Sequence, residues 1–203
     1  MKKILSKNIE IGLIFGLICA ILLSFSRFNA ECDDLRANVL RLHIIANSDS
    51  ATDQSVKLKV RDELLKNSGV IFKECTTLDD AIISATGKTD EICEIANKVL
   101  KENGFNYLAG AKVCDSYFET REYDDFTLPA GTYKSLTVKL GKAKGHNWWC
   151  VIFPAVCLPS ASNASLADTT SKASATMAQN GKKYVIKFKS VEIYEDLKKK
   201  FQF

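Results

Sequence analysis

The sequence predicts an α+β fold: a single domain with helices packed on a mainly antiparallel sheet, preceded by an N-terminal signal or anchor helix. Three observations indicate this. A basic start precedes an uncharged apolar run over residues 11–25. Hydrophobic residues alternate with period two over residues 39–46, 105–113 and 136–140, as in strands. They recur at helical spacing over residues 56–64 and 92–100, which is typical of amphipathic helices.

Residues 1–26 are predicted to be a signal peptide or a membrane anchor. Three lysines before position 8 precede the apolar run from Ile11 to Phe25, which is the order of a secretory signal. The run is shorter than the roughly 20 residues that a spanning helix needs, although Ser24 and Ser26 extend the stretch of low polarity. Cleavage after Ser26 and retention as an anchor, with membrane association through residues 9–26, are both compatible with this pattern. Either one sends the remaining chain outward.

Charge and cysteine content narrow the class of protein. The formal net charge of +4 falls to +2 without residues 1–26, and a nearly neutral body argues against a nucleic-acid partner. Six of the seven cysteines lie outside the apolar run, an even number compatible with disulfides outside the cell. The chain has two histidines and no C-x-x-C motif, so no metal or cofactor is expected. A site built from both histidines and a cysteine is the less favoured alternative.

Residues 39–65 predict a strand, a capped loop and a helix. The strand pattern over residues 39–46 has one fully apolar face, which marks a half-buried strand. The sequence NSDSATD at 47–53 supplies side chains that cap helices. Val56, Val60 and Leu64 then follow at helical spacing. This segment is therefore interpreted as a strand that leads through a polar loop into a helix.

Residues 78–153 predict more helix and then the remaining strands. A helical region over residues 78–103 is interrupted near residues 87–89 and ends at Asn103-Gly104, a left-handed C-cap signal. Period-two segments follow on both sides of a turn at 128–131, and the loop GKAKG at 141–145 leads into a last strand from Trp148 to Phe153. The α+β domain is assigned to residues 27–159.

The C-terminal part is assigned to two further segments. Residues 160–183 are rich in Ser, Ala and Thr, so they are expected to be a linker or at most a weak helix. Residues 184–203 are expected to form a strand and a helix, because Tyr184, Ile186 and Phe188 alternate before a second helical stripe. That strand would return to the main sheet.

The sequence GHNWWCVIFPAVC at 145–157 has several interpretations. Cys150 and Cys157 lie symmetrically about the Phe153–Pro154 bond, so a hairpin there would place them opposite each other, within reach of a disulfide. Two buried free thiols and a nucleophilic Cys150 are the alternatives. A nucleophile needs a base within hydrogen-bond reach. His146 is about 13 Å away along a straight strand, whereas His43 could approach from another strand.

Polar and aromatic residues around these segments predict a surface for a partner. The run from Asn47 to Ser50 exceeds what one helix start requires, although capping alone is the simpler interpretation. Trp148 and Trp149 point to opposite faces of a strand, so one can enter the core while the other contacts a partner; burial of both is the alternative. The candidate partner-binding residues are His43, Asn47, Ser48, Asp49, His146, Asn147, Trp148 and Trp149.

Two long segments resemble the stage II sporulation protein R family. They are HIIANSDSATDQSVKLKVRDELL at 43–65 and LPAGTYKSLTVKLGKAKGHNWWCVIFP at 128–154, and the resemblance covers about residues 35–158. FPAVCLP at 153–159 departs from the family's usual Phe-Pro-Pro-Leu-Cys-Phe. The family motif falls on His43, Asn47, Ser48, Asp49, Asp53, Gln54, Lys57, Arg61, Asp62, Gly145, His146, Asn147, Trp148, Trp149, Cys150 and Cys157.

The resemblance implies an exported sporulation signal rather than an enzyme. Such a protein is made in the forespore and secreted across the forespore membrane into the space between the two membranes. There it activates a membrane-embedded aspartic protease of the mother cell, which cleaves the sigma-E precursor. Two other hypotheses compete: an extracytoplasmic Cys-His hydrolase or thiol enzyme using Cys150 with His43 or His146, and a cell-envelope module that binds through the GKAKG loop.

Overall fold

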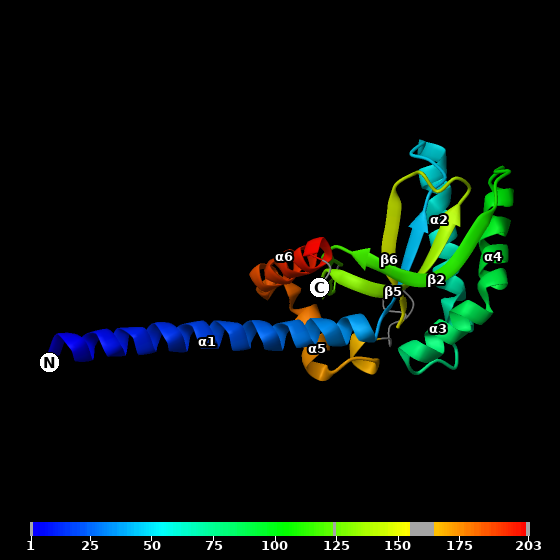
Figure 1. Ribbon diagram of the computed structural model, residues 1–203. Helices are drawn as coiled ribbons and strands as arrows, with labels where there is room; N and C mark the ends of the chain where they lie inside the picture. The colour runs from blue at the N-terminus through cyan, green and yellow to red at the C-terminus, as the bar shows by residue number, and fades with distance from the viewer. Residues whose placement is uncertain (1, 124, 155–164, 202–203) are drawn as a thin grey trace.

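A computed structural model describes residues 2–123, 125–154 and 165–201 and shows an α+β fold. A long N-terminal helix projects from a mixed sheet and its surrounding helices (Figure 1). The elements are α1 (Lys2–Ala37), β1 (Leu40–Ile45), α2 (Ala51–Ile71), α3 (Leu78–Gly87), α4 (Thr89–Glu102), β2 (Ala109–Phe118), β3 (Arg121–Glu122), β4 (Thr127–Leu128), β5 (Gly131–Leu140), β6 (Asn147–Phe153), η1 (Leu166–Asp168), α5 (Lys172–Gln179), η2 (Gly181–Lys183) and α6 (Val185–Phe201).

The main sheet has the strand order β2-β5-β1-β6. β2 pairs antiparallel with β5 and β6 pairs antiparallel with β1, while β1 and β5 are parallel. β3 and β4 form a separate two-stranded sheet. The predicted mainly antiparallel sheet is confirmed, with one parallel pair at its centre.

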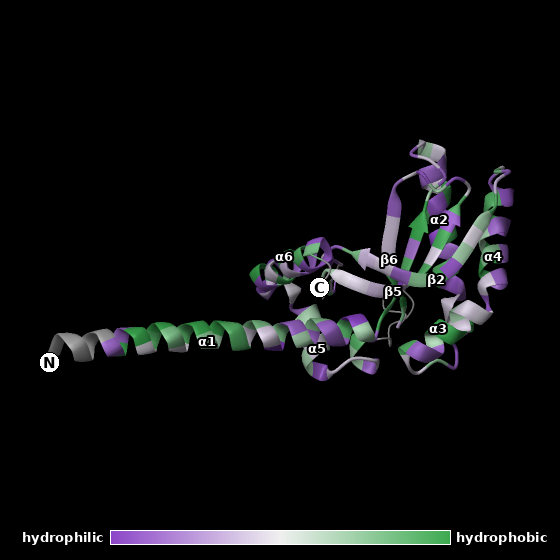
Figure 2. Cartoon of the chain, in the orientation of Figure 1, coloured by the Kyte–Doolittle hydropathy of each residue, from purple (hydrophilic) through white to green (hydrophobic). Residues whose placement is uncertain are grey.

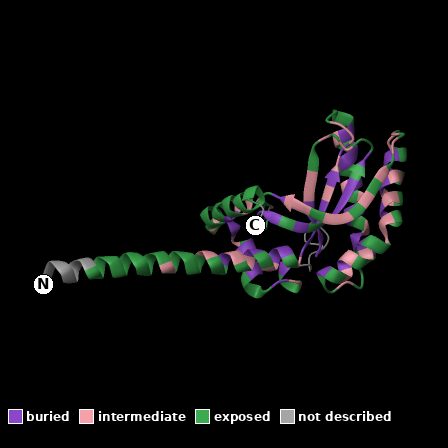
Figure 3. Ribbon diagram, in the orientation of Figure 1, coloured by how far each residue is buried: buried purple, intermediate pink, exposed green. Residues whose placement is uncertain are grey.

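A first hydrophobic core lies between one face of the sheet and helices α2, α3 and α4. Its sheet side includes Leu42, Ile44, Leu136 and Val138, all fully buried. Its helix side includes the predicted stripes of α2 and α4, which are buried apart from the half-buried Ile95 (Figure 3). The period-two and helical patterns of the sequence therefore identified this core.

The predicted ends of these helices are also confirmed. Ser50 is the N-cap of α2, and its side chain accepts a hydrogen bond from the backbone N–H of Asp53. The interruption between α3 and α4 falls at Lys88. Gly104, after α4, has φ +80, the left-handed conformation that glycine adopts without strain.

A second hydrophobic core lies on the other side of the sheet. It joins the last part of α1 to α5, α6 and β4. Ala175, Met177 and Ala178 of α5 are buried in it. Of the two alternatives predicted for residues 160–183, the linker is therefore wrong for the described residues 165–183, which contain the helix α5. Small side chains let α5 pack closely against α1, and Ser171 caps the first turn of α5. Residues whose composition is typical of linkers therefore form a helix here.

The predicted strand at the start of residues 184–203 is wrong as well, because the described part of that segment from Val185 to Phe201 is the helix α6. Tyr184 and Phe188 are four residues apart and both contact the ring of Phe28, at 5.7 and 5.2 Å between centroids. Ile186 between them is 83% exposed. Residues four apart share one side of a helix, so the alternating pattern had two interpretations and the contact with α1 selects the helical one.

Helix α1 has two parts with different environments. From Asn8 to Arg27 its residues are exposed or half-buried, and this part is strongly hydrophobic (Figure 2). From Phe28 onward the helix contributes Phe28, Cys32 and Leu35 to the second core. Among the described helices, α1 is the one long and apolar enough to cross a membrane, which fits either a secretion signal or an anchor. The change from exposed to buried residues coincides with the predicted boundary at Ser26.

Candidate functional site

The predicted polar residues gather at the end of the sheet where β1 stops and β6 begins. There the loop after β1 lies against the loop 141–146. The backbone N–H of Gly145 donates to the carbonyl of Ala46 at 2.9 Å, and that of Lys144 donates to the carbonyl of Asn47 at 3.2 Å. A Cβ on Gly145 would lie 2.2 Å from the carbonyl oxygen of Ser48. Only glycine allows the two loops to approach this closely.

Asp53, in the first turn of α2, organises this contact. Its carboxylate accepts hydrogen bonds from the Asn47 amide at 2.9 Å, the Ser48 hydroxyl at 2.5 Å and the Tyr107 hydroxyl at 2.5 Å. Burial alone would raise the pKa of Asp53, but the bonds from Ser48, Tyr107 and Asn47 outweigh it and lower that pKa. The buried carboxylate thereby ties the loop after β1 to α2 and to the segment before β2.

Two of the predicted site residues, Asn47 and Ser48, belong to this hydrogen-bond network. Asn47 also accepts a hydrogen bond from the backbone N–H of Lys142 at 2.9 Å. Ser48 accepts one from the side chain of Gln54, through its carbonyl, at 2.9 Å. Asn47 and Ser48 are therefore half-buried residues whose hydrogen bonds hold the two loops together.

Lys57 reinforces the same contact from α2. Its ammonium donates to the Gln54 side chain at 2.6 Å and to the carbonyl of His146 at 2.9 Å. Burial lowers its pKa. Helix spacing places Gln54 and Lys57 on one side of α2. The sequence shows the spacing of Gln54 and Lys57. It does not show that the two side chains bond to each other, or that Lys57 also reaches the loop 141–146.

Asp49 and His146 form the exposed part of this end of the molecule. One carboxylate oxygen of Asp49 accepts from the His146 backbone N–H at 2.6 Å and lies 2.5 Å from its ring Nδ1. Both side chains remain accessible, at 55% and 78% exposure. The bonds from the His146 backbone and ring lower the pKa of Asp49. This pair is fixed in position and open to a partner.

The two tryptophans lie on opposite faces of β6, as predicted, and both are half-buried. Trp148 packs against the first core, and the Arg61 guanidinium lies 4.3 Å from its ring centroid. Its indole N–H is buried without a hydrogen-bond partner among the described residues. Trp149 is on the other face, with its ring 6.0 Å from the His43 ring and 6.3 Å from Phe118. Trp149 is thus the better candidate for contact with a partner.

His43 belongs to the same surface as Trp149. Its Nε2 lies 2.9 Å from the side-chain oxygen of Asn147, and burial lowers its pKa. The structure therefore brings His43, Asn147 and Trp149 together, next to the pair of Asp49 and His146. These five residues are called the sheet-end patch below. Trp148 lies on the opposite face and is separate from it.

Arg41, two residues before His43 on the same face of β1, is a fully buried cation that the sequence had not marked as functional. Its guanidinium lies 4.3 Å from the ring centroid of Phe118 and 5.0 Å from that of Tyr133. Its Nε donates to the carbonyl of Cys150 at 3.1 Å, and another nitrogen donates to the Tyr123 hydroxyl at 2.8 Å. Such cation–π contacts compensate part of the cost of burying the charge. Arg41 and its aromatic neighbours give the patch a rigid base.

The geometry does not assemble the proposed Cys-His pair. Cys150 is opposite Leu42 and His43 is opposite Trp149 in the β1–β6 register. Cys150 therefore points into the first core while His43 points to the other face. The ring of His146 is exposed and held by Asp49. Cys157 lies outside the described residues, and so does its predicted disulfide with Cys150.

Cys114 has a thiol surrounded by hydroxyl groups. On β2 its sulfur lies 3.5 Å from the Thr137 hydroxyl and 3.7 Å from that of Ser116. Burial would raise the pKa of Cys114, but hydrogen bonds from Thr137, Ser116 and Ser135 and the charge of Lys112 lower it overall. Within the described residues, no three His, Cys, Asp or Glu side chains are arranged to hold a metal ion.

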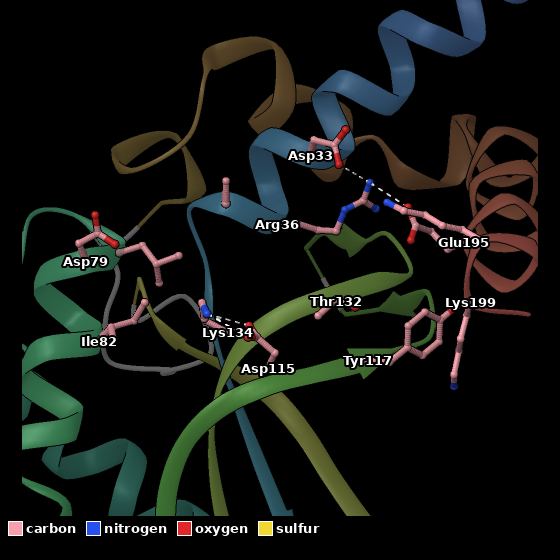
Figure 4. A pocket seen from close by; sticks show the side chains of 13 residues that line it. Asp33, Arg36, Asp79, Ile82, Asp115, Tyr117, Thr132, Lys134, Glu195 and Lys199 are labelled. Carbon is pink, nitrogen blue, oxygen red and sulfur yellow. Dashed lines mark hydrogen bonds and ion pairs between the residues drawn. The ribbon is translucent and has the colours of Figure 1, made fainter. Parts of the chain in front are cut away.

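A groove lies away from the sheet-end patch. It has a volume of about 810 Å³ and runs between the end of α1, the start of α3, the strands β2 and β5, and α6. Its charged side chains are largely paired with each other (Figure 4). Arg36 lies 3.6 Å from Glu195, and Lys134 lies 2.9 Å from Asp115. The groove contains none of the predicted site residues.

Comparison with known proteins assigns the chain to a family. The family model for stage II sporulation protein R matches residues 36–163. The chain belongs to the stage II sporulation protein R family. A relative with that name from Bacillus subtilis (strain 168) is 36% identical over 124 residues. The alignment covers 61% of this chain and 55% of the relative, so the chain spans about half the length of that protein. No solved structure matches the chain.

This stage II sporulation protein R family member has its matched residues in the sheet and the first core. The match includes the whole sheet-end patch and the residues of the Asp53 network. The family resemblance seen in the sequence is thereby confirmed. The helices α5 and α6, and nearly all of α1, lie outside the match.

Proposed function

We propose that this protein is an exported sporulation signal that activates a membrane-embedded aspartic protease of the mother cell. It would be made in the forespore and act in the space between the two membranes, where the protease then processes the sigma-E precursor. The family membership carries this proposal. The apolar first part of α1 supports export, because it fits a secretion signal or an anchor.

The sheet-end patch is the proposed contact surface for the protease. It combines an aromatic ring, Trp149, with the polar groups of Asn147 and the pair of Asp49 and His146. Interfaces concentrate their binding energy in a few such residues, tryptophan prominent among them. To activate, the protein must bind the active form of the protease more tightly than the inactive form.

Reconstitution tests this function directly. The full chain, the protease and the sigma-E precursor are combined in lipid vesicles, and the rate of precursor cleavage is measured with and without the chain. Cleavage is expected to depend on the chain. If the protease were equally active without it, or if the chain alone turned over a substrate, the proposal would be wrong.

The contact surface is tested with Trp149→Ala. A hot-spot truncation costs about 2 kcal/mol or more of binding, so the chain concentration needed for half-maximal cleavage should rise about 30-fold. Ile83→Ala, which truncates a 71% exposed side chain on α3, is the control and should change nothing. If Trp149→Ala and Ile83→Ala both folded and gave equal half-maximal concentrations, Trp149 would not be part of the interface.

A further inference from the structure

The start of α6 carries a basic segment with exposed aliphatic side chains. The sequence KKYVIKFK at 182–189 contains four lysines, and no acidic residue occurs between 181 and 191. Lys182, Lys183, Val185 and Ile186 are exposed, while Phe188 is buried. The segment lies outside the family match, so the family membership assigns it no role.

This segment is held next to the place where the apolar part of α1 ends. The Lys187 ammonium donates to the Ser24 hydroxyl at 3.2 Å. The rings of Tyr184 and Phe188 pack against Phe28. On the other side, the backbone of Gly181 is buried so closely against Thr127 that a Cβ there would lie 2.0 Å from its hydroxyl oxygen. The position of the basic segment relative to α1 is thus fixed by contacts on both sides.

The outward side of α6 carries a line of apolar side chains with lysines at its beginning; one of them, Lys189, is ion-paired with Glu192 at 2.9 Å. Ile186, Ile193 and Leu197 follow at spacings of seven and four, and all are exposed, so they form one line on the side opposite the buried Phe188. Lys187 and Lys189 flank the beginning of this line. A helix with exposed aliphatic side chains between lysines is typical of elements that lie at a lipid–water interface.

We propose that the segment Lys182–Lys189 binds a lipid surface with anionic headgroups. The lysines contact headgroup phosphates, and the side chains of Val185 and Ile186 enter the interfacial layer. The contact with Ser24 places this segment at the level where α1 would leave the bilayer. The surface remains after a cut at Ser26, so it holds the exported body at the membrane with or without the first part of α1.

A second copy of the chain is a poorer occupant of this surface. Two copies that packed through the same segment would bring four lysines of each against the other, and like charges at close range destabilise an interface. An anionic bilayer instead offers both chemical features that the segment requires, negative charge and an apolar layer beneath it.

The proposal rests on α1 acting as an export signal or anchor, and it is tested without the protease. The full chain is reconstituted into vesicles whose lipids carry bromine on the acyl chains, a quencher of tryptophan emission. Ile186→Trp places a probe on the segment. Ile83→Trp is the matched control, since Ile83 is 71% exposed on α3, which packs in the other core, and is tethered to the same vesicle by α1.

In anionic vesicles, the emission added by Ile186→Trp should shift to the blue and be largely quenched, whereas that added by Ile83→Trp should not. Replacing Lys182, Lys183, Lys187 and Lys189 together by Gln should abolish this quenching, and raising the ionic strength should weaken it. A charge-matched control replaces by Gln four exposed lysines of α2, α4 and the loop between α2 and α3, namely Lys66, Lys73, Lys98 and Lys101.

Equal quenching of the two tryptophan probes would overturn the proposal, because it would show proximity to the vesicle without insertion of the segment. Equal quenching in anionic and zwitterionic vesicles would overturn the role of the lysines. A blue shift that grew with protein concentration and was indifferent to lipid bromination would assign the surface to a second copy. Failure of the protease assay would leave all three readouts unaffected.

Discussion

Substitution of Asp53 should reveal how strongly the sheet-end patch depends on one buried carboxylate. Asp53 is 5% exposed and accepts three side-chain hydrogen bonds, from Asn47, Ser48 and Tyr107. A hydrogen bond to a charged group contributes about 1.5–3 kcal/mol. Asp53→Asn keeps the shape but exchanges one acceptor oxygen for a donor, so it should cost about 2 kcal/mol. Asp53→Ala removes all three bonds and should cost about 5 kcal/mol, near the lower end of three such contributions.

The assay is urea unfolding of the full chain in detergent, followed by tryptophan emission. Both tryptophans belong to β6, so their emission reports on the sheet. For a domain of this size, 1 kcal/mol corresponds to a shift in Tm of about 2–4 °C, which gives a second measurement. Asp62→Asn is the control in the same helix. The side chain of Asp62 is 65% exposed, so its substitution should change stability by less than about 0.5 kcal/mol.

The pH dependence provides a further test of the same reasoning. The folded-state pKa of Asp53 is lowered, below an unfolded value of about 3.9. Its contribution is therefore fully present above about pH 4 and is lost as the pH falls through the folded-state pKa. The stability difference between the protein and Asp53→Asn should shrink in that acid range. A difference within 0.5 kcal/mol of zero at pH 7, or one constant down to pH 3, would refute this account.

Three further substitutions and one chemical modification have defined outcomes. Gly145→Ala should destabilise the fold by about 1–3 kcal/mol through overpacking against the Ser48 carbonyl. Gly69→Ala, whose Cβ meets open space in α2, should stabilise it by about 0.5–1 kcal/mol. Urea unfolding measures both changes. Gly181→Ala should speed hydrogen exchange in α5 and α6 and leave α2 to α4 unchanged. Pulsed alkylation read by mass spectrometry should modify Cys114, whose pKa is lowered, before Cys32, whose pKa burial raises to about 12, since the thiolate reacts.

Hydrophobic periodicity predicted the sheet and the first core because the side chains that enter this core alternate along the strands and recur at helical spacing in α2 and α4. The β1 pattern is an example: Leu40, Leu42 and Ile44 enter the first core as expected. Periodicity gave the wrong element for residues 184–188, because an alternating strand pattern there also contains an i, i+4 pair typical of a helix. The contact of Tyr184 and Phe188 with α1 favours the helix. Composition failed for α5, because alanine and serine build both linkers and closely packed helices.

The candidate site was only partly predictable for a different reason. The sequence shows which side chains are polar, but not which of them face each other after folding. Asn47 and Ser48 were predicted to meet a partner, and the sequence did not show that both also bond to Asp53. Trp148 and Trp149 were correctly placed on opposite faces, because alternation along a strand is local geometry. Arg41 was not predicted, because its aromatic neighbours Phe118 and Tyr133 are more than 70 positions away.

The position of the sheet-end patch relative to α1 limits how a partner can reach it. β1 begins at Leu40, directly after α1, and runs across the axis of that helix (Figure 1). The patch lies at the other end of β1, one strand length or about 20 Å from α1. Residues 27–37 add about 16 Å of helix beyond the predicted signal boundary. If α1 stays in the forespore membrane, the patch stands clear of that bilayer, so the proposed protease in the mother-cell membrane would meet it through a segment in the space between the two membranes. A photo-crosslinker at Asn147 should accordingly label an extracytoplasmic segment of the protease, and labelling confined to its membrane-spanning helices would contradict this placement.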